Sequence, residues 1–115
     1  MVSVRWRCAT GLMDRMRGLL GQAPLAPGEA LWIAPCRAVH TIGLGDAIDV
    51  IFVDKRARVL RIVHRLRPGR LAWCWRAWAT IELAAGEATR VGWKEGMVVL
   101  PGCLLESAQP GAGAD

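Results

Sequence analysis

The stretch IDVIFV at residues 48–53 decides the fold, because it is a nearly unbroken apolar run that contains a single carboxylate, Asp49. Such a run is typical of a strand that is covered on both faces. A lone buried carboxylate costs several kcal/mol unless it is paired or hydrogen-bonded. We therefore expect a covered strand at 48–53, with Asp49 held by the imidazole of His40 from the preceding turn.

Strand patterns flank this run on both sides. Residues 2–8 alternate between apolar and polar, 30–34 form a short apolar strand, and 54–58 form a turn. The next strand, 59–67, should turn Arg61, Arg65 and Arg67 outward and His64 inward. A short strand is expected at 97–100. A long strand is expected over 73–83, with an inward face made of Trp73, Trp75, Ala77, Ala79, Ile81 and Leu83.

Two helices complete the predicted fold. Thr10 can cap a helix that ends at Gly21, and a short helix is expected over 86–91. Strands joined by short turns favour the α+β class: a small, mainly antiparallel, open barrel-like β-sheet with one N-terminal helix and a short second helix. The sequence predicts a single domain over 1–105 and a disordered tail over 106–115.

Composition narrows the class of protein. The longest uncharged stretch, 96–105, is about half of the roughly 20 residues that a membrane-spanning helix needs. Residues 1–9 lack the features of a secretory signal, so a cytoplasmic protein without membrane partners is expected. Cysteines occur at Cys8, Cys36, Cys74 and Cys103 without a C-x-x-C pair, which favours buried thiols.

A cluster of polar residues offers a candidate site. Cys36, His40 and Thr41 lie in one loop, and loops held by a rigid sheet often carry function. Asp49 and Glu82 could join them in one ligand-binding pocket. Three interpretations stay open: a metal site, a nucleophilic Cys36 or Thr41 served by His40 and Asp49, and polar ties that fix the loop with or without a ligand. The last is preferred, and no metal or cofactor is predicted.

Nucleic acid is a further possible partner. The net charge is +5, and single strands are held by charged grooves with aromatic stacking platforms. The expected core positions of Trp73 and Trp75 argue against this interpretation, since only Trp78 would project outward. No phosphate-binding glycine loop occurs. The cationic and aromatic residues concerned are Arg61, Arg65, Arg67, Arg70, Arg76, Trp73, Trp75 and Trp78.

Four blocks carry a resemblance to a known family: RMRGLLG at 15–21, CRAVHT at 36–41, IDVIFVD at 48–54 and ELAAG at 82–86. In order and spacing they resemble the bacterial and archaeal domain-of-unknown-function family DUF192. The resemblance implies a compact α+β domain with a barrel-like sheet and brings no enzyme activity. It marks motif positions at His40, Thr41, Asp49, Glu82 and Gly86.

The chain also departs from the family pattern. Relatives usually have a Met, a basic residue, an aromatic residue and a Pro where this chain has Leu44, Gly45, Asp46 and Ala47. If those side chains contact a ligand in relatives, this chain has lost the contact.

The sequence assigns no biochemical function. The preferred hypothesis is a small binding or accessory module, with a small ligand or a partner protein at Cys36, His40, Thr41, Asp49 and Glu82. The alternatives are a hydrolase or metal-assisted enzyme that uses Cys36, His40 and Asp49, and a basic nucleic-acid-binding domain.

Overall fold

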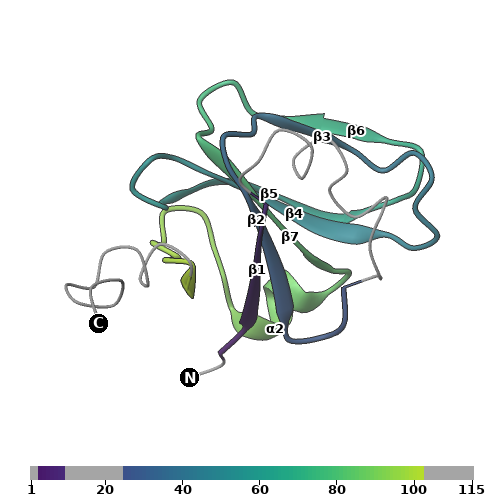
Figure 1. Cartoon of the computed structure of the whole chain (residues 1–115), viewed down its shortest axis with the longest axis horizontal. Coiled ribbons are helices and arrows are strands. Elements are labelled where there is room, and N and C mark those ends of the chain that lie inside the picture. Colours follow the sequence, from purple (N-terminus) through teal and green to yellow (C-terminus); the bar gives the residue numbers. More distant parts are fainter. Residues whose placement is uncertain (1–2, 10–24, 103–115) are drawn as a thin grey trace, which may run out of the picture.

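The computed structural model describes residues 3–9 and 25–102 (Figure 1). The predicted helix at 10–21 and the predicted tail at 106–115 lie outside these ranges. The described part contains seven strands and one helix. They are β1 (Arg5–Ala9), β2 (Glu29–Ile33), β3 (Ala38–His40), β4 (Ile48–Val53), β5 (Val59–Leu66), β6 (Leu71–Trp73), β7 (Ala79–Ala84) and α2 (Glu87–Val91).

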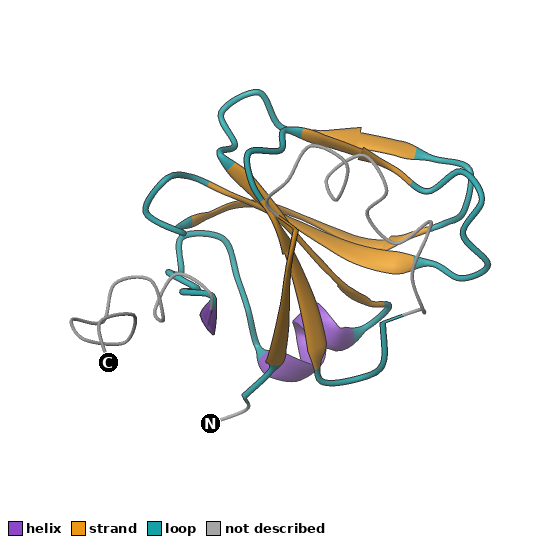
Figure 2. Ribbon diagram, in the orientation of Figure 1, coloured by secondary structure: helices purple, strands orange, loops and turns teal. Residues whose placement is uncertain are grey.

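The described strands form two sheets. Five of them have the order β1-β2-β7-β4-β5, in which β1 runs parallel to β2 and every other pair is antiparallel. β3 and β6 form a separate two-stranded antiparallel sheet, which crosses one side of the larger sheet while α2 lies at its far end (Figure 2). The prediction of a mostly antiparallel sheet is confirmed. The single barrel-like sheet is replaced by this pair of sheets, because β3 and β6 bond only to each other.

Burial on both faces of β4 explains the layering. All six residues of β4 are buried, as the apolar run predicted. Val50 and Phe52 belong to one apolar core with Val39 and Ala72 of the small sheet. Ile51 and Val53 point the other way, into a second core with Ala88 of α2. Each such fully buried side chain stabilises the fold by roughly 1.5–3 kcal/mol.

The long strand predicted over 73–83 is wrong. Its first residues end β6 in the small sheet, and its last residues form β7 in the large one. The loop between them is held by backbone bonds from the N–H of Cys74 to the carbonyl of Arg37 (2.8 Å) and from Trp78 to Val53 (2.8 Å). The alternating Trp and Ala residues have the sequence pattern of a strand with a buried face. In the structure, however, 46% of Trp73 and 75% of Trp75 are exposed.

Two smaller predictions also fail. The expected strand at 97–100 is reduced to an isolated bridge between Arg58 and Val98. His64 was expected to face inward, and it is exposed. The cause is a β-bulge: β4 and β5 change register between Ile48 and Val50, which interrupts the alternation of β5. The short helix at 86–91 is confirmed as α2.

Asp49 bridges this bulge to the start of α2. Its Oδ1 accepts the backbone N–H of Arg65 (2.9 Å), and its Oδ2 accepts the N–H of Ala88 (2.8 Å). Arg65 has a φ of 50°, and Gly86, the N-cap of α2, has no side chain with which to cap the helix. The fully buried Asp49 carboxylate therefore stabilises the bulge and replaces the missing cap. No hydrogen bond in the described part joins Asp49 to His40, so that predicted pairing is corrected.

Gly86 is required at this junction for two reasons. Its φ of 87° is in the left-handed region that favours glycine. A Cβ atom here would lie 2.9 Å from Nη2 of Arg65, so a larger residue would displace that side chain.

We expect Asp49→Ala to lower the free energy of unfolding by about 3–5 kcal/mol. The variant loses both hydrogen bonds to the Asp49 carboxylate. The N–H groups of Arg65 and Ala88 are then left without this acceptor. Urea unfolding measures the effect, with the exposed Asp46→Ala as the matched control. A loss below about 1 kcal/mol for Asp49→Ala would show that the bridge is not important for stability.

Candidate functional site

Thr41 stabilises the turn between β5 and β6, and its hydroxyl is fully buried. The side chain is fully buried, and its Oγ1 donates to the carbonyl of Arg67 (2.6 Å) and accepts the N–H of Arg70 (2.9 Å). Its backbone bonds to the same turn through Gly69 and Arg70. Thr41 therefore fixes the connection between β5 and β6.

His40 lies on the outer surface of the small sheet. It pairs in register with Leu71, and both side chains are exposed, whereas Val39 and Ala72 turn into the core. Successive side chains on a strand point to opposite faces. The imidazole therefore points away from the core that the two sheets share, and a ligand role for His40 stays a prediction.

Cys36 is a half-buried free thiol whose Sγ donates to the carbonyl of Ala38 (3.2 Å). Its own carbonyl accepts the buried hydroxyl of Thr80 (3.0 Å). No hydrogen bond in the described ranges links Cys36, His40 and Asp49, so the nucleophile interpretation has no assembled triad. In those ranges no group of three or more His, Cys, Asp or Glu residues is placed to hold a metal ion.

The expectation of four buried thiols is wrong at one described cysteine. Cys8 is exposed and disulfide-bonded. Cys74 is a half-buried free thiol, as is Cys36.

Glu82 lies on the opposite face of the large sheet from Asp49. Its neighbours across β7 are Leu31 of β2 and Val50 of β4, both in the core that faces the small sheet. Only 4% of Glu82 is exposed, and its Oε2 has no hydrogen-bond partner among the described residues. Burial raises the pKa of Glu82 to about 7.

The structure therefore does not bring the five predicted residues to one place. Asp49 faces α2, Glu82 faces the apolar core on the other side, and His40 faces solvent. Thr41 and Cys36 are engaged with backbone groups of two different loops. Within residues 3–9 and 25–102, no hydrogen bond joins any two of these five side chains to each other.

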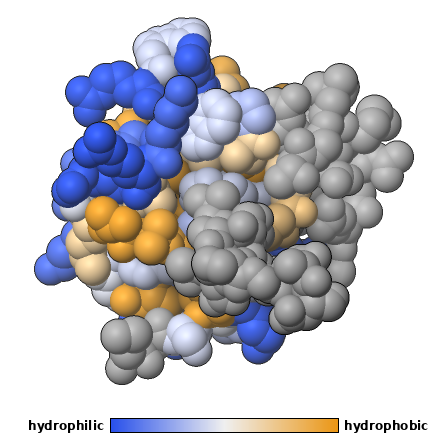
Figure 3. Space-filling view, turned by 60° about the vertical axis from the view of Figure 1, so that its left-hand side comes forward, coloured by the Kyte–Doolittle hydropathy of each residue, from blue (hydrophilic) through white to orange (hydrophobic). Residues whose placement is uncertain are grey.

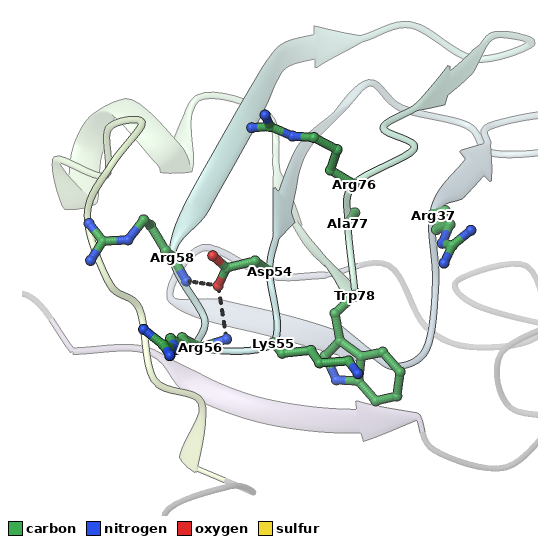
Figure 4. Close-up of a pocket in the computed structure, with 8 residues that line it drawn as sticks. All are labelled: Arg37, Asp54, Lys55, Arg56, Arg58, Arg76, Ala77 and Trp78. Atoms are coloured by element: carbon green, nitrogen blue, oxygen red, sulfur yellow. Dashed lines mark hydrogen bonds between the residues drawn. The ribbon is translucent and has the colours of Figure 1, made fainter.

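A basic pocket lies at the other end of β4. It forms where the turn between β4 and β5 faces the loop between β6 and β7, and it has a volume of about 430 Å³. Figure 4 shows its side chains, which come from three separate segments of the chain. The lining residues are Arg37, Asp54, Lys55, Arg56, Arg58, Arg76, Ala77 and Trp78.

The single carboxylate of this pocket belongs to its framework. Oδ1 of Asp54 accepts the backbone N–H groups of Arg56 (2.8 Å) and Arg58 (3.0 Å) of its own turn. The N–H of Arg58 holds the pKa of Asp54 below its usual range, with smaller help from Arg56 and from both guanidinium charges. Asp54 thus stays ionised and shapes the turn, as Asp residues in turns commonly do.

The cations that surround Asp54 are largely free. The two ion pairs of the described part of the chain, Arg7–Glu29 and Arg90–Glu87, lie elsewhere. Within the pocket, Arg58 donates to the carbonyl of Gly96 (2.8 Å), and Nζ of Lys55 lies 5.4 Å from the centre of the Trp78 ring. The side chains of Arg37, Arg56 and Arg76 are exposed and have no hydrogen-bond partner in the described ranges. The pocket lining therefore contains five cationic side chains and one carboxylate that is already hydrogen-bonded by its own turn.

The left-hand side of the molecule in Figure 1 combines hydrophilic with hydrophobic surface. Turning the left-hand side of Figure 1 forward gives the view in Figure 3, where strongly hydrophilic residues gather at the upper left and border hydrophobic ones. Sequence reasoning missed the pocket, because residues 54–58 were interpreted as a turn only. The signal was present: DKRAR places three cations in five residues.

Fold and site together define a small β-rich domain with a basic surface pocket. A family model matches residues 2–100, so the chain belongs to the DUF192 family, described as an uncharacterized ACR, and the resemblance is confirmed. No functionally curated protein matches the sequence significantly.

Two solved structures share the fold. A protein of unknown function from Novosphingobium aromaticivorans DSM 12444 is 23% identical, with a TM-score of 0.71 over 81% of this chain and 71% of that one. A protein from Sinorhizobium meliloti 1021, provisionally described as a transcription regulator, is 17% identical, with a TM-score of 0.71 over 79% of this chain and 76% of its own. Likeness at these identities shows the fold alone.

We expect Glu82 to make stability depend on pH. The folded protein holds this proton more tightly than the unfolded chain, whose carboxyl has the ordinary pKa of 4.5. The stability contributed by protonated Glu82 is therefore complete below pH 4.5 and is lost as the pH rises through about 7. Glu82→Gln keeps the neutral shape, so its advantage over the wild type should grow by about 3 kcal/mol between these limits.

Thermal or urea unfolding of both proteins across this pH range measures the difference. The exposed Glu95→Gln serves as the control and should follow the wild type. Parallel pH profiles for wild type and Glu82→Gln would contradict the raised pKa of the buried Glu82 carboxyl.

Proposed function

We propose that this protein is a non-catalytic binding module whose basic pocket, between residues 54–58 and 76–78, takes a phosphate-bearing anion. The observation that carries the proposal is the charge imbalance of the pocket: five cationic side chains surround one carboxylate that its own turn already satisfies. Clustered charges of one sign in a concave surface raise the local concentration of oppositely charged ligands.

The chemistry of the cations favours phosphate over other anions. Four of the five are arginines, and guanidinium groups bind phosphate oxygens through pairs of parallel N–H bonds. Arg56 and Arg76 approach the pocket from opposite walls, one from the β4–β5 turn and one from the β6–β7 loop (Figure 4). Both arginines are therefore available to an anion that enters the pocket.

An enzyme that uses Cys36, His40 and Asp49 receives less support. Both oxygens of Asp49 are engaged by the N–H groups of Arg65 and Ala88, on the face covered by α2. His40 lies on the exposed face of the small sheet. A general base must lie within hydrogen-bond reach of its nucleophile, and no such contact joins these residues in the described ranges.

We expect pyrophosphate to bind the wild-type protein at low salt, and the double variant Arg56→Gln/Arg76→Gln to bind it at least about tenfold more weakly. Each lost guanidinium removes a charge-assisted hydrogen bond of roughly 1.5–3 kcal/mol. Isothermal titration calorimetry measures both affinities.

The matched control is Arg67→Gln/Arg70→Gln, which removes the same charge from exposed positions outside the pocket. It should retain most of the wild-type affinity. Equal losses of affinity in the two double variants would show that pyrophosphate responds to net charge and not to the pocket. Absence of pyrophosphate binding to the wild-type protein would refute the proposal.

A further inference from the structure

The end of β6 and the loop after it, which forms one wall of the pocket, carry three exposed indole rings. Trp75 is 75% exposed, Trp73 is 46% exposed and Trp78, which lines the pocket, is 39% exposed. Large aromatic side chains normally bury most of their surface, because each removes 150–250 Å² from water. Three exposed indoles within six residues therefore mark a contact surface.

Hydrogen bonds fix the backbone that carries these rings. Arg61 donates from Nη1 to the carbonyl of Trp73 (2.6 Å), and the N–H of Cys74 bonds to Arg37 (2.8 Å). Ala77 is buried in the core, and its N–H bonds to Cys74 (3.0 Å). Binding to rings on such a backbone loses little backbone entropy, which is an advantage for affinity.

Cationic side chains lie close to these tryptophans. Arg76 lies between Trp75 and Trp78 in sequence, Lys55 approaches the Trp78 ring, and the Arg61 guanidinium is bonded at Trp73. A single-stranded nucleic acid offers matching groups, with phosphates along its backbone and flat bases beside them. A duplex offers its bases already stacked, which leaves the indoles without partners.

We infer that the ligand of the basic pocket is single-stranded nucleic acid, whose bases stack on Trp75 and the neighbouring indoles while its phosphates contact the pocket arginines. This inference rests on the proposed anion site and adds the class of ligand. It also reverses the argument from sequence against nucleic acid, which depended on core positions for Trp73 and Trp75. Stacking and charge are both insensitive to base identity, so binding is sequence-tolerant.

An anionic membrane surface is the competing partner for cations mixed with tryptophan. Interfacial binding is typical of helices with one continuous apolar face, rich in Trp, Phe and Leu. Here Arg76 comes between Trp75 and Trp78 in the sequence, and Trp78 lines a concave basic pocket, which favours a thin, flexible polyanion. Vesicle binding is therefore an outcome that the experiment must distinguish.

Fluorescence anisotropy of a labelled oligothymidylate of about 12 nucleotides, titrated with the full chain, provides the test. We expect binding that weakens about 10- to 50-fold between about 50 and 200 mM salt, as for three or four phosphate contacts. The matching duplex should bind less tightly. Trp75→Ala should weaken oligothymidylate binding about tenfold or more, Trp75→Phe should restore part of it, and the exposed control Ile42→Ala should have no effect.

Pyrophosphate affinity separates this inference from the proposed function. Trp75→Ala should leave pyrophosphate binding unchanged, because the indole contributes stacking and no charge. Pyrophosphate binding without oligothymidylate binding, or oligothymidylate binding that ignores Trp75→Ala, would overturn the inference and leave the anion site standing. Binding to vesicles of phosphatidylcholine and phosphatidylserine without oligothymidylate binding would also overturn it. Failure of both pyrophosphate and oligothymidylate to bind would overturn both proposals.

Discussion

A buried carboxylate with two backbone partners organises this domain. Asp49 accepts the N–H of Arg65 at a bulge in β5 and the N–H of Ala88 in the first turn of α2. The first bond stabilises a residue with positive φ, and the second caps a helix whose N-cap is a glycine. This single side chain therefore joins β4 to its neighbour β5 and to the helix α2. Charged hydrogen bonds in a dry interior are strong when fully satisfied.

The two ends of β4 consequently have different roles. At its start, Asp49 holds the scaffold. At its end, about 16 Å away at roughly 3.3 Å per residue, Asp54 orders the turn that carries Lys55, Arg56 and Arg58. The polar positions that relate this chain to the DUF192 family, among them Asp49, Thr41 and Gly86, serve the first role. The second role falls to surface loops, where a rigid sheet positions charged and aromatic side chains for binding.

The sequence predicts the fold correctly where a buried apolar run allows only one kind of element. It fails where strand register or hydrogen bonds between distant residues determine the structure. The apolar run 48–53 is compatible only with a covered strand. A carboxylate buried in such a strand, Asp49, requires a hydrogen-bond partner. Its actual partners are the backbone N–H of Arg65 at a bulge and that of Ala88 in the first turn of α2. No pattern of residue types in the sequence predicts a bulge at Arg65. Glu82 was grouped with Asp49, yet a register that pairs it with Val50 places the two carboxylates on opposite faces. The alternating residues from Trp73 onward have the pattern of a strand. In the structure, backbone bonds from Cys74 to Arg37 and from Trp78 to Val53 hold residues 74–78 as a loop, and Trp75 and Trp78 are exposed.

The most direct test of the functional division along β4 is a map of backbone and indole N–H chemical shifts of the full chain during titration with pyrophosphate. If the basic pocket is the binding site, the shifts change at residues 54–58, at 76–78 and at Arg37, and remain constant at His40, Thr41 and Glu82. Shift changes concentrated at those last three residues, with the two loops unaffected, would place the site in the polar cluster and contradict the assignment of that cluster to the scaffold.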